Sequence, residues 1–121
     1  MKAILATLLL SSLMLAGCSG SGGASVTPQQ DSQGRYLIHL TSGNMFSPAH
    51  AKVPKGAVVV WHHDGGAPND VQARDGSFSS GPAGGMTEGM EFVHQFNETG
   101  TWEVFCHIHE GSGMKAKITV E

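Results

Sequence analysis

Hydrophobic and polar residues alternate along several short stretches of the chain, with the period of two that is typical of half-buried β-strands. Each of these stretches has one apolar or mostly apolar face. The faces are formed by Tyr36, Ile38 and Leu40; by Phe92, His94 and Phe96; by Trp102, Val104 and Cys106; and by Met114, Ala116, Ile118 and Val120. A continuous apolar run from Ala57 to Trp61 predicts a further strand that is buried on both sides.

Turn residues separate these stretches, and no stretch has a sustained helical period. Glycine, proline, asparagine and aspartate recur between the apolar segments, as they do in the turns of β-proteins. Several short strands joined by such turns predict an all-β domain built as an antiparallel sandwich or barrel. The chain has 121 residues, which is enough for one domain with a single core.

The first residues have the composition of an export signal. A positive start at Lys2 is followed by an apolar run from Ala3 to Leu15, which is too short to span a membrane permanently. The tetrad Leu15-Ala16-Gly17-Cys18 resembles a bacterial lipoprotein box. This resemblance implies cleavage before Cys18 and attachment of lipid to that cysteine. The alternative is an ordinary signal peptide with a cysteine present by chance.

A Gly- and Ser-rich stretch from Ser19 to Ser25 follows this cysteine and predicts a flexible tether. We therefore expect three parts: a signal peptide at residues 1–17, the lipidated Cys18 with a linker at 18–34, and a folded domain at 35–121. Such a chain would be anchored by lipid to a membrane of the cell envelope, on its periplasmic or extracellular face.

The charge pattern argues against one class of partner, nucleic acids. The formal net charge is −3, and the basic residues form no patch or stripe. A protein that binds nucleic acid needs such a patch, so we expect no nucleic-acid partner.

One short segment contains three residues that commonly bind soft metals. Cys106, His109 and Met114 stand at the spacing C-x₂-H-x₄-M, after a predicted strand and within a Gly-rich turn. A thiolate, an imidazole and a thioether together suit copper. If Cys18 carries lipid, Cys106 has no partner for a disulfide, and metal binding explains an unpaired thiol in an exported protein. Chance clustering of a buried cysteine, a surface histidine and a core methionine is the structural alternative.

The region from Ser47 to Glu121 resembles the plastocyanin and halocyanin branch of the cupredoxins. The resemblance rests on Ser47-Pro48-Ala49, Val53-Pro54-Lys55-Gly56, Val58-Val59-Val60-Trp61, Asp75-Gly76-Ser77-Phe78, Phe92 to Cys106, and above all the loop with Cys106, His109 and Met114. It implies a Greek-key β-sandwich of about eight strands. It also implies one type 1 copper ion, which exchanges single electrons with redox partner proteins.

The chain departs from this family at two positions. Relatives usually carry the first copper histidine before Asn-Val, whereas this chain reads Pro68-Asn69-Asp70-Val71, which puts Asn69 in the histidine position. An amide oxygen is a harder and weaker copper ligand than imidazole. Ile108 stands where plastocyanin-like loops commonly have proline, and this change matters less because other apolar residues can shape the turn.

Three hypotheses follow from Asn69. In the first, Cys106, His109 and Met114 hold copper, and Asn69 or a water molecule is a weak fourth partner. In the second, His62 or His63, at the end of the third strand, replaces the missing histidine. In the third, the domain no longer uses redox copper and serves as a binding or structural module.

We expect a monomeric electron carrier with one copper ion, and not an enzyme. The alternative is a module that binds or delivers Cu(I) without fast redox cycling. The tetrad from Cys106 to His109 also resembles the Cys-His-Ile segment of multicopper oxidases. Those enzymes need further His-x-His pairs, and this chain has only the pair formed by His107 and His109.

Overall fold

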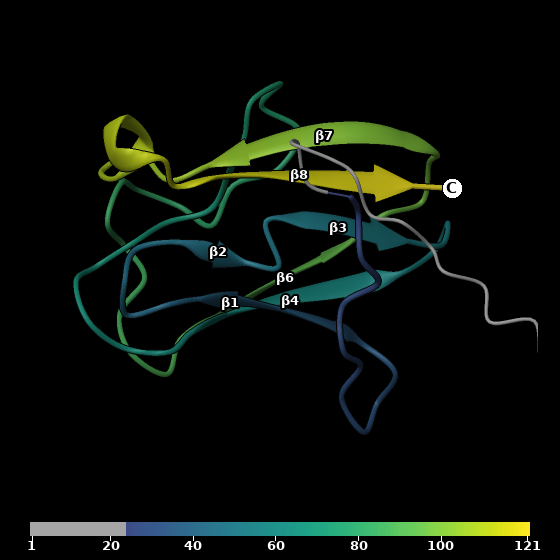
Figure 1. Cartoon of the computed structure of the whole chain (residues 1–121), viewed down its shortest axis with the longest axis horizontal. Helices are drawn as coiled ribbons and strands as arrows, with labels where there is room; N and C mark the ends of the chain where they lie inside the picture. The colour runs from purple at the N-terminus through teal and green to yellow at the C-terminus, as the bar shows by residue number, and fades with distance from the viewer. Residues whose placement is uncertain (1–23) are drawn as a thin grey trace, which may run out of the picture.

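The two four-stranded sheets of the molecule pack face to face as a β-sandwich (Figure 1). The computed structural model describes residues 24–121. The strands are β1 (Tyr36–Leu40), β2 (Phe46–Ser47), β3 (His50–Val53), β4 (Val58–His63), β5 (Gln72–Ala73), β6 (Glu91–Gln95), β7 (Gly100–Phe105) and β8 (Lys115–Val120), with one 3₁₀ turn, η1 (Glu110–Ser112). These eight strands confirm the predicted all-β sandwich.

The order of strands is β2-β1-β4-β6 in one sheet and β3-β8-β7-β5 in the other. The expectation of a purely antiparallel arrangement is wrong, because β1 pairs with β4 and β3 pairs with β8 in parallel. Both parallel pairs join strands that are not connected by a hairpin, and alternation along the sequence carries no information about such partners.

The predicted apolar faces meet in the core between the sheets. Ile38 and Leu40 from β1, Val104 from β7 and Ile118 from β8 are each at most 1% exposed. Trp61 lies at the centre of an aromatic cluster, with ring centroids 5.7 Å from Phe78, 5.5 Å from Phe92 and 6.3 Å from Phe96. Alternation therefore predicted which side of each of these strands faces inward.

The chain makes ordered contacts before β1, earlier than the expected start of the domain at residue 35. The Val26 N–H donates to the His50 carbonyl (3.0 Å), and the Lys52 N–H donates to the Val26 carbonyl (2.9 Å), both on β3. Three residues later, the Gln29 carbonyl accepts from the N–H of Leu37 in β1 (2.8 Å). The second half of the expected linker thus contacts both sheets.

The signal peptide at 1–17 and the lipidation at Cys18 lie outside the described residues. Within residues 24–121, no helix is both long enough and apolar enough to cross a membrane.

Candidate metal centre

The loop between β7 and β8 closes on itself through backbone hydrogen bonds. Cys106 follows the last residue of β7, and Met114 precedes the first residue of β8. The Cys106 N–H donates to the Met114 carbonyl, and the Met114 N–H donates to the His109 carbonyl, both at 3.1 Å. The two sheet strands therefore fix the positions of all three candidate ligands, which lie at one end of the sandwich.

Gly113 makes the turn of this loop possible. It ends η1 with φ +99°, in the left-handed region that favours glycine, and its N–H donates to the Glu110 carbonyl (3.0 Å). On the outside of the turn, Arg74 forms an ion pair with Glu110 and lies over the ring of Phe105, 4.0 Å from its centroid. These contacts attach η1 to the β7 sheet.

The candidate donor atoms converge around the buried sulfur of Cys106. Its Sγ lies 3.8 Å from Nδ1 of His109 and 3.5 Å from Oδ1 of Asn69, and these two atoms are 2.6 Å apart. Cys106, Met114 and Asn69 are 0% exposed, whereas His109 is half-buried at the rim. The structure therefore brings Cys106, His109 and Asn69 together, although Asn69 lies 37 residues away from Cys106 in sequence.

Asn69 is held in this position by its backbone. It forms an isolated antiparallel bridge with Met86, in which the Asn69 N–H donates to the Met86 carbonyl (2.9 Å) and the Met86 N–H donates to the Asn69 carbonyl (2.8 Å). Its side-chain oxygen points at the same nitrogen and sulfur that a metal ion would contact. Asn69, the residue that the family resemblance aligns with the first copper histidine, thus lies beside Cys106 and His109.

Asp70 is a buried residue of the site that the sequence analysis did not single out. Its Oδ1 accepts from the backbone N–H of His107 (3.1 Å) and lies 3.0 Å from the His107 ring Nδ1, while Oδ2 accepts from the Gly84 N–H (2.9 Å). Oδ2 also lies 3.6 Å from the sulfur of Cys106. The carboxylate therefore links three loops around the site. Its position beside Asn69 was the only sequence signal for this role.

Burial and hydrogen bonding act in opposite directions on the acids of this site. Burial by itself would raise the pKa of Asp70, but hydrogen bonds from Gly84, His107 and Gln72 outweigh it and lower that pKa. Burial raises the pKa of the Cys106 thiol, and the nearby Asp70 carboxylate adds to this effect, although local hydrogen bonds oppose it. The metal-free site therefore holds an ionised carboxylate next to a protonated thiol.

The two histidines at the end of β4 differ in their relation to the site. His63 is fully buried and its Nε2 lies 3.5 Å from the Asn69 amide nitrogen. However, its Nδ1 accepts from the Gly65 N–H (3.1 Å) and its Nε2 is 2.9 Å from the Ala67 carbonyl, so backbone groups use both ring nitrogens. His62 points to the opposite face of β4 and contacts Asp64. The geometry favours neither histidine as a replacement ligand.

The donor set suits a soft metal ion. Cys106, His109 and the buried Met114 offer sulfur and nitrogen donors, and Asn69 offers an oxygen next to the Cys106 sulfur and the His109 nitrogen. Copper accepts thiolate, imidazole and thioether ligands, and an amide oxygen is tolerated as a weak additional contact. The residues present therefore fit copper, with one oxygen in place of a second imidazole.

Comparisons with known proteins agree with this geometry. Residues 35–121 match the model of the copper binding proteins of the plastocyanin/azurin family. Plastocyanin from Scenedesmus fuscus is 26% identical over 85 residues, which cover 64% of this chain and 87% of the relative. The chloroplastic plastocyanin of Fritillaria agrestis is 32% identical over 95 residues, covering 69% of this chain and 57% of the relative.

Among solved structures, a purple cupredoxin from Nitrosopumilus maritimus superposes with a TM-score of 0.59 at 26% sequence identity. The match covers 70% of this chain and 98% of the cupredoxin.

Proposed function

Because the chain belongs to the plastocyanin/azurin family of copper binding proteins, we propose that it binds one copper ion and carries single electrons between partner proteins. The ligands in this proposal are Cys106, His109 and Met114, with Asn69 as a weak fourth contact. The observation that carries it is the convergence of the Cys106 sulfur, the His109 nitrogen and the Asn69 oxygen within 3.8 Å of one another at a buried point.

The fold holds the candidate ligands in fixed positions, and it buries Cys106 and Met114. When bound, copper supplies the one-electron redox change, and a geometry that stays the same in both oxidation states keeps reorganisation small. Cys106 and Met114 are anchored at the ends of two core strands, and the backbone bonds between them resist displacement. His109 is the half-exposed ligand, so its ring is the edge nearest to a partner protein.

Addition of Cu(II) to the metal-free chain tests this proposal. We expect one equivalent of copper per chain, an intense visible band from charge transfer between thiolate and copper, and loss of the band in Cys106→Ser. A His50→Gln variant, on β3 and outside the set of candidate ligands, is the matched control and should keep the band. If neither Cu(II) nor Cu(I) binds stoichiometrically, and the melting temperature does not respond to copper, the domain is a non-metal interaction module.

The second candidate function is a module that binds or delivers Cu(I) without fast redox cycling. The position of the Asn69 oxygen favours it, because an amide in place of imidazole disfavours Cu(II) more than Cu(I). Repeated oxidation and reduction by a soluble electron carrier separates the two functions, since only the electron carrier turns over. In the delivery module, Asn69→His should strengthen Cu(II) binding and introduce turnover, whereas Asn69→Gln should do neither.

We also propose that the chain acts in the cell envelope, anchored through lipid on Cys18, as an electron carrier and not as an enzyme. The composition of residues 1–18 supports this location. Mass spectrometry of the mature chain from its native host tests it, because an acylated N-terminal cysteine has a defined added mass. Cys18→Ala should release the protein into the soluble fraction, and retention of that variant in the membrane would contradict the anchor.

A further inference from the structure

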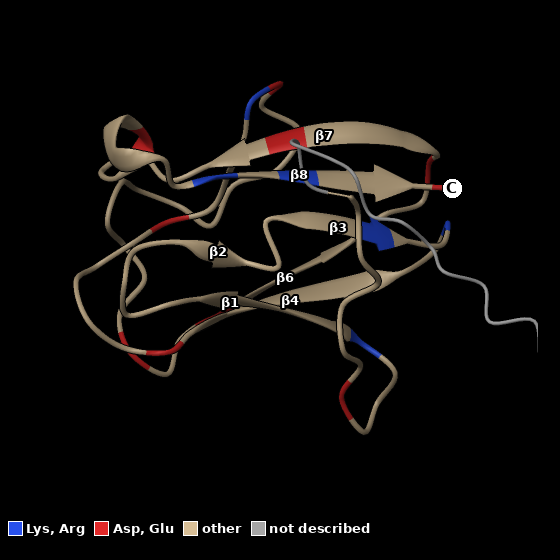
Figure 2. Cartoon of the chain, in the orientation of Figure 1, with Lys and Arg blue, Asp and Glu red and all other residues tan. Residues whose placement is uncertain are grey.

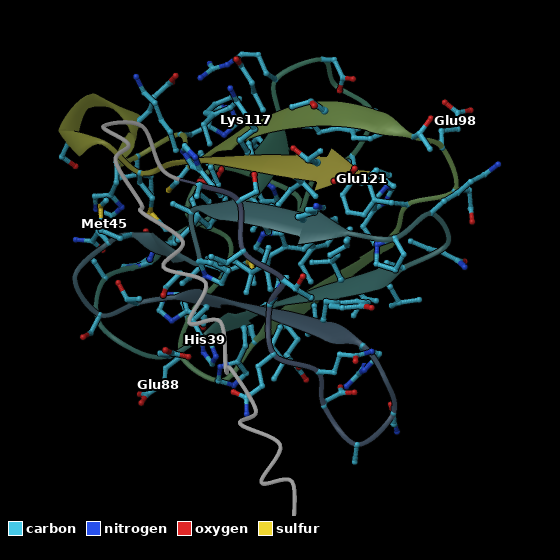
Figure 3. All side chains as sticks on the ribbon, turned by 45° about the vertical axis from the view of Figure 1, so that its right-hand side comes forward. His39, Met45, Glu88, Glu98, Lys117 and Glu121 are labelled. Atoms are coloured by element: carbon cyan, nitrogen blue, oxygen red, sulfur yellow. The ribbon has the colours of Figure 1, made fainter. Side chains whose placement is uncertain are left out.

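Two histidines and an aspartate gather on the outer face of the β1–β4 sheet, away from the Cys106 site. His39 of β1 and His62 of β4 are register partners in the parallel pair, and Asp64 follows the end of β4. Their side chains are 41%, 38% and 37% exposed, respectively. Figure 3 shows His39 projecting from the same edge of the molecule as Glu88.

The three side chains already share one centre. Nδ1 of His39 and Nδ1 of His62 each lie 2.9 Å from the same carboxylate oxygen, Oδ1 of Asp64. The two rings are 6.3 Å apart at an angle of 71°, so they approach the carboxylate from different directions. One donor atom from each residue lies within 4.8 Å of the other two.

This spacing is close to that of a metal site. A tetrahedral ion with bonds of about 2.0–2.1 Å requires donor atoms about 3.3 Å apart, which small side-chain rotations of these exposed residues would reach. A carboxylate can only accept hydrogen bonds, so each Nδ1 that contacts it carries a proton without metal. A cation would replace those protons as the group that holds the three side chains together.

The electrostatic surroundings favour a cation. Glu91 of β6 is the register partner of His62 and lies on the same face, and Glu88 lies near Gly65. Among the residues that the structure describes, Figure 2 shows acidic segments and no basic ones near the C-terminal ends of β1 and β4, where His39 and His62 lie. Although partial burial would raise the pKa of Asp64, the hydrogen bonds that its carboxylate accepts from His39 and His62 lower that pKa.

We propose that His39, His62 and Asp64 form a second metal site, which binds a divalent ion that favours imidazole nitrogen, Zn²⁺ or Cu²⁺. Two imidazoles and one carboxylate are a common ligand set for such ions, and the fourth position remains for water or for Glu91. Because every residue of β1 is paired with a residue of β4, the two imidazoles come from rigid neighbouring strands. The site is independent of Cys106, since His62 and the inward-facing His63 lie on opposite faces of β4.

Zn²⁺ titration of the whole chain with Cys106→Ser tests this site, because that substitution removes the thiolate of the other centre. We expect one equivalent of Zn²⁺, with the ring resonances of His39 and His62 shifting first in the NMR spectrum. Addition of His39→Gln or His62→Gln should weaken binding by more than about tenfold, since even indirect partners of a ligand change metal affinity by about that factor. His50→Gln is the matched control and should leave the affinity unchanged.

A competition experiment separates the two ions. If copper is the preferred occupant, Cu²⁺ should displace Zn²⁺ from the Cys106→Ser chain. An electron paramagnetic resonance spectrum with coupling to nitrogen should then appear. Retention of Zn²⁺ in the presence of Cu²⁺ assigns the site to zinc. The proposal is overturned if the Cys106→Ser chain takes up no Zn²⁺, or if the variant that also lacks both histidines binds it equally well while circular dichroism shows a native fold.

Discussion

At the residue scale, Asp70 is the buried charge on which the loops of the candidate copper site depend. It is 0% exposed, and its two oxygens accept hydrogen bonds from His107 and Gly84, which belong to two different loops. A buried carboxylate is stable only when its hydrogen bonds are complete. Asp70 therefore contributes through its partners, and removal of the carboxylate leaves those partners without an acceptor.

Asp70→Ala should lower the free energy of unfolding by about 2–6 kcal/mol, because two partly buried backbone N–H groups lose their acceptor at about 1–3 kcal/mol each. Asp70→Asn keeps one acceptor oxygen at nearly the same volume and should lose less than Asp70→Ala. Urea unfolding of the metal-free variants measures both changes. Equal stability of Asp70→Ala and the parent chain would show that the loops are held by other contacts.

His94 should make stability depend on pH. Its ring is stacked on Phe78, with centroids 4.4 Å apart, and burial lowers its pKa from the ordinary value of 6.5. As pH falls below about 6.5, the unfolded chain binds a proton at this residue before the folded chain does, so stability is lost. At higher pH, His94 is neutral in both states and has no such effect.

The measurement is urea unfolding of the parent chain and His94→Gln at about pH 7.5 and about pH 5.5. The parent chain should lose more stability than the variant between these two values. Parallel losses in the two proteins would contradict the role of His94.

The chemistry of the site could be predicted from the sequence only where it is local. Cys106, His109 and Met114 lie in one loop, so their spacing could be recognised, and Asn69 was located by the family pattern at Pro68-Asn69-Asp70-Val71. Asp70 could not be recognised in this way. Acids are seldom fully buried, and its partners lie 14 and 37 residues away in sequence.

At the scale of the elements, alternation predicted the inward faces but not the pairing of strands. The faces of β7 and β8 agree with the pattern because each is a single regular strand with one side in the core. The strands β2 and β5 are two residues long, which is too short for a periodic pattern. The parallel pairs depend on contacts between distant segments, and local sequence does not encode them.

The aromatic cluster between the two sheets contains a buried polar group, the indole N–H of Trp61. Among the described residues, the indole N–H of Trp61 is buried without a hydrogen-bond partner. Trp61→Phe removes this group and keeps the stacking on Phe92, so it should cost less than about 2 kcal/mol. Trp61→Ala leaves a cavity and should cost about 3–5 kcal/mol. Chemical unfolding compares them, and equal losses would mean that the ring contacts are not what stabilises the cluster.

At the scale of the whole molecule, the segment before β1 joins the two sheets. Val26 is bonded to β3 and Gln29 to β1, and Pro28 between them is buried. This segment lies outside the family match at residues 35–121. A chain that begins at Arg35 should be less stable by about 2–4 kcal/mol, because it loses the three backbone hydrogen bonds to β1 and β3, at about 1 kcal/mol each, and exposes the surface that Pro28 covers.

Thermal unfolding of the shortened chain, next to a chain that begins at Ala24, tests this role. The shorter chain should melt at a lower temperature with an unchanged strand content in circular dichroism. Identical melting temperatures would mean that the segment rests on the domain without stabilising it.

The position of β8 inside its sheet affects the order in which the strands can pair during synthesis. This strand lies between β3 and β7 in the sheet that carries Cys106. Until β8 has been synthesised, no strand connects β3 with β7. A nascent chain can pair β1 with β4 and β4 with β6, but it cannot yet close the sandwich. Sheets that depend on such distant pairings assemble late and slowly. The candidate copper site therefore takes shape only once β8 has been synthesised, because Cys106 and Met114 stand at the ends of β7 and β8.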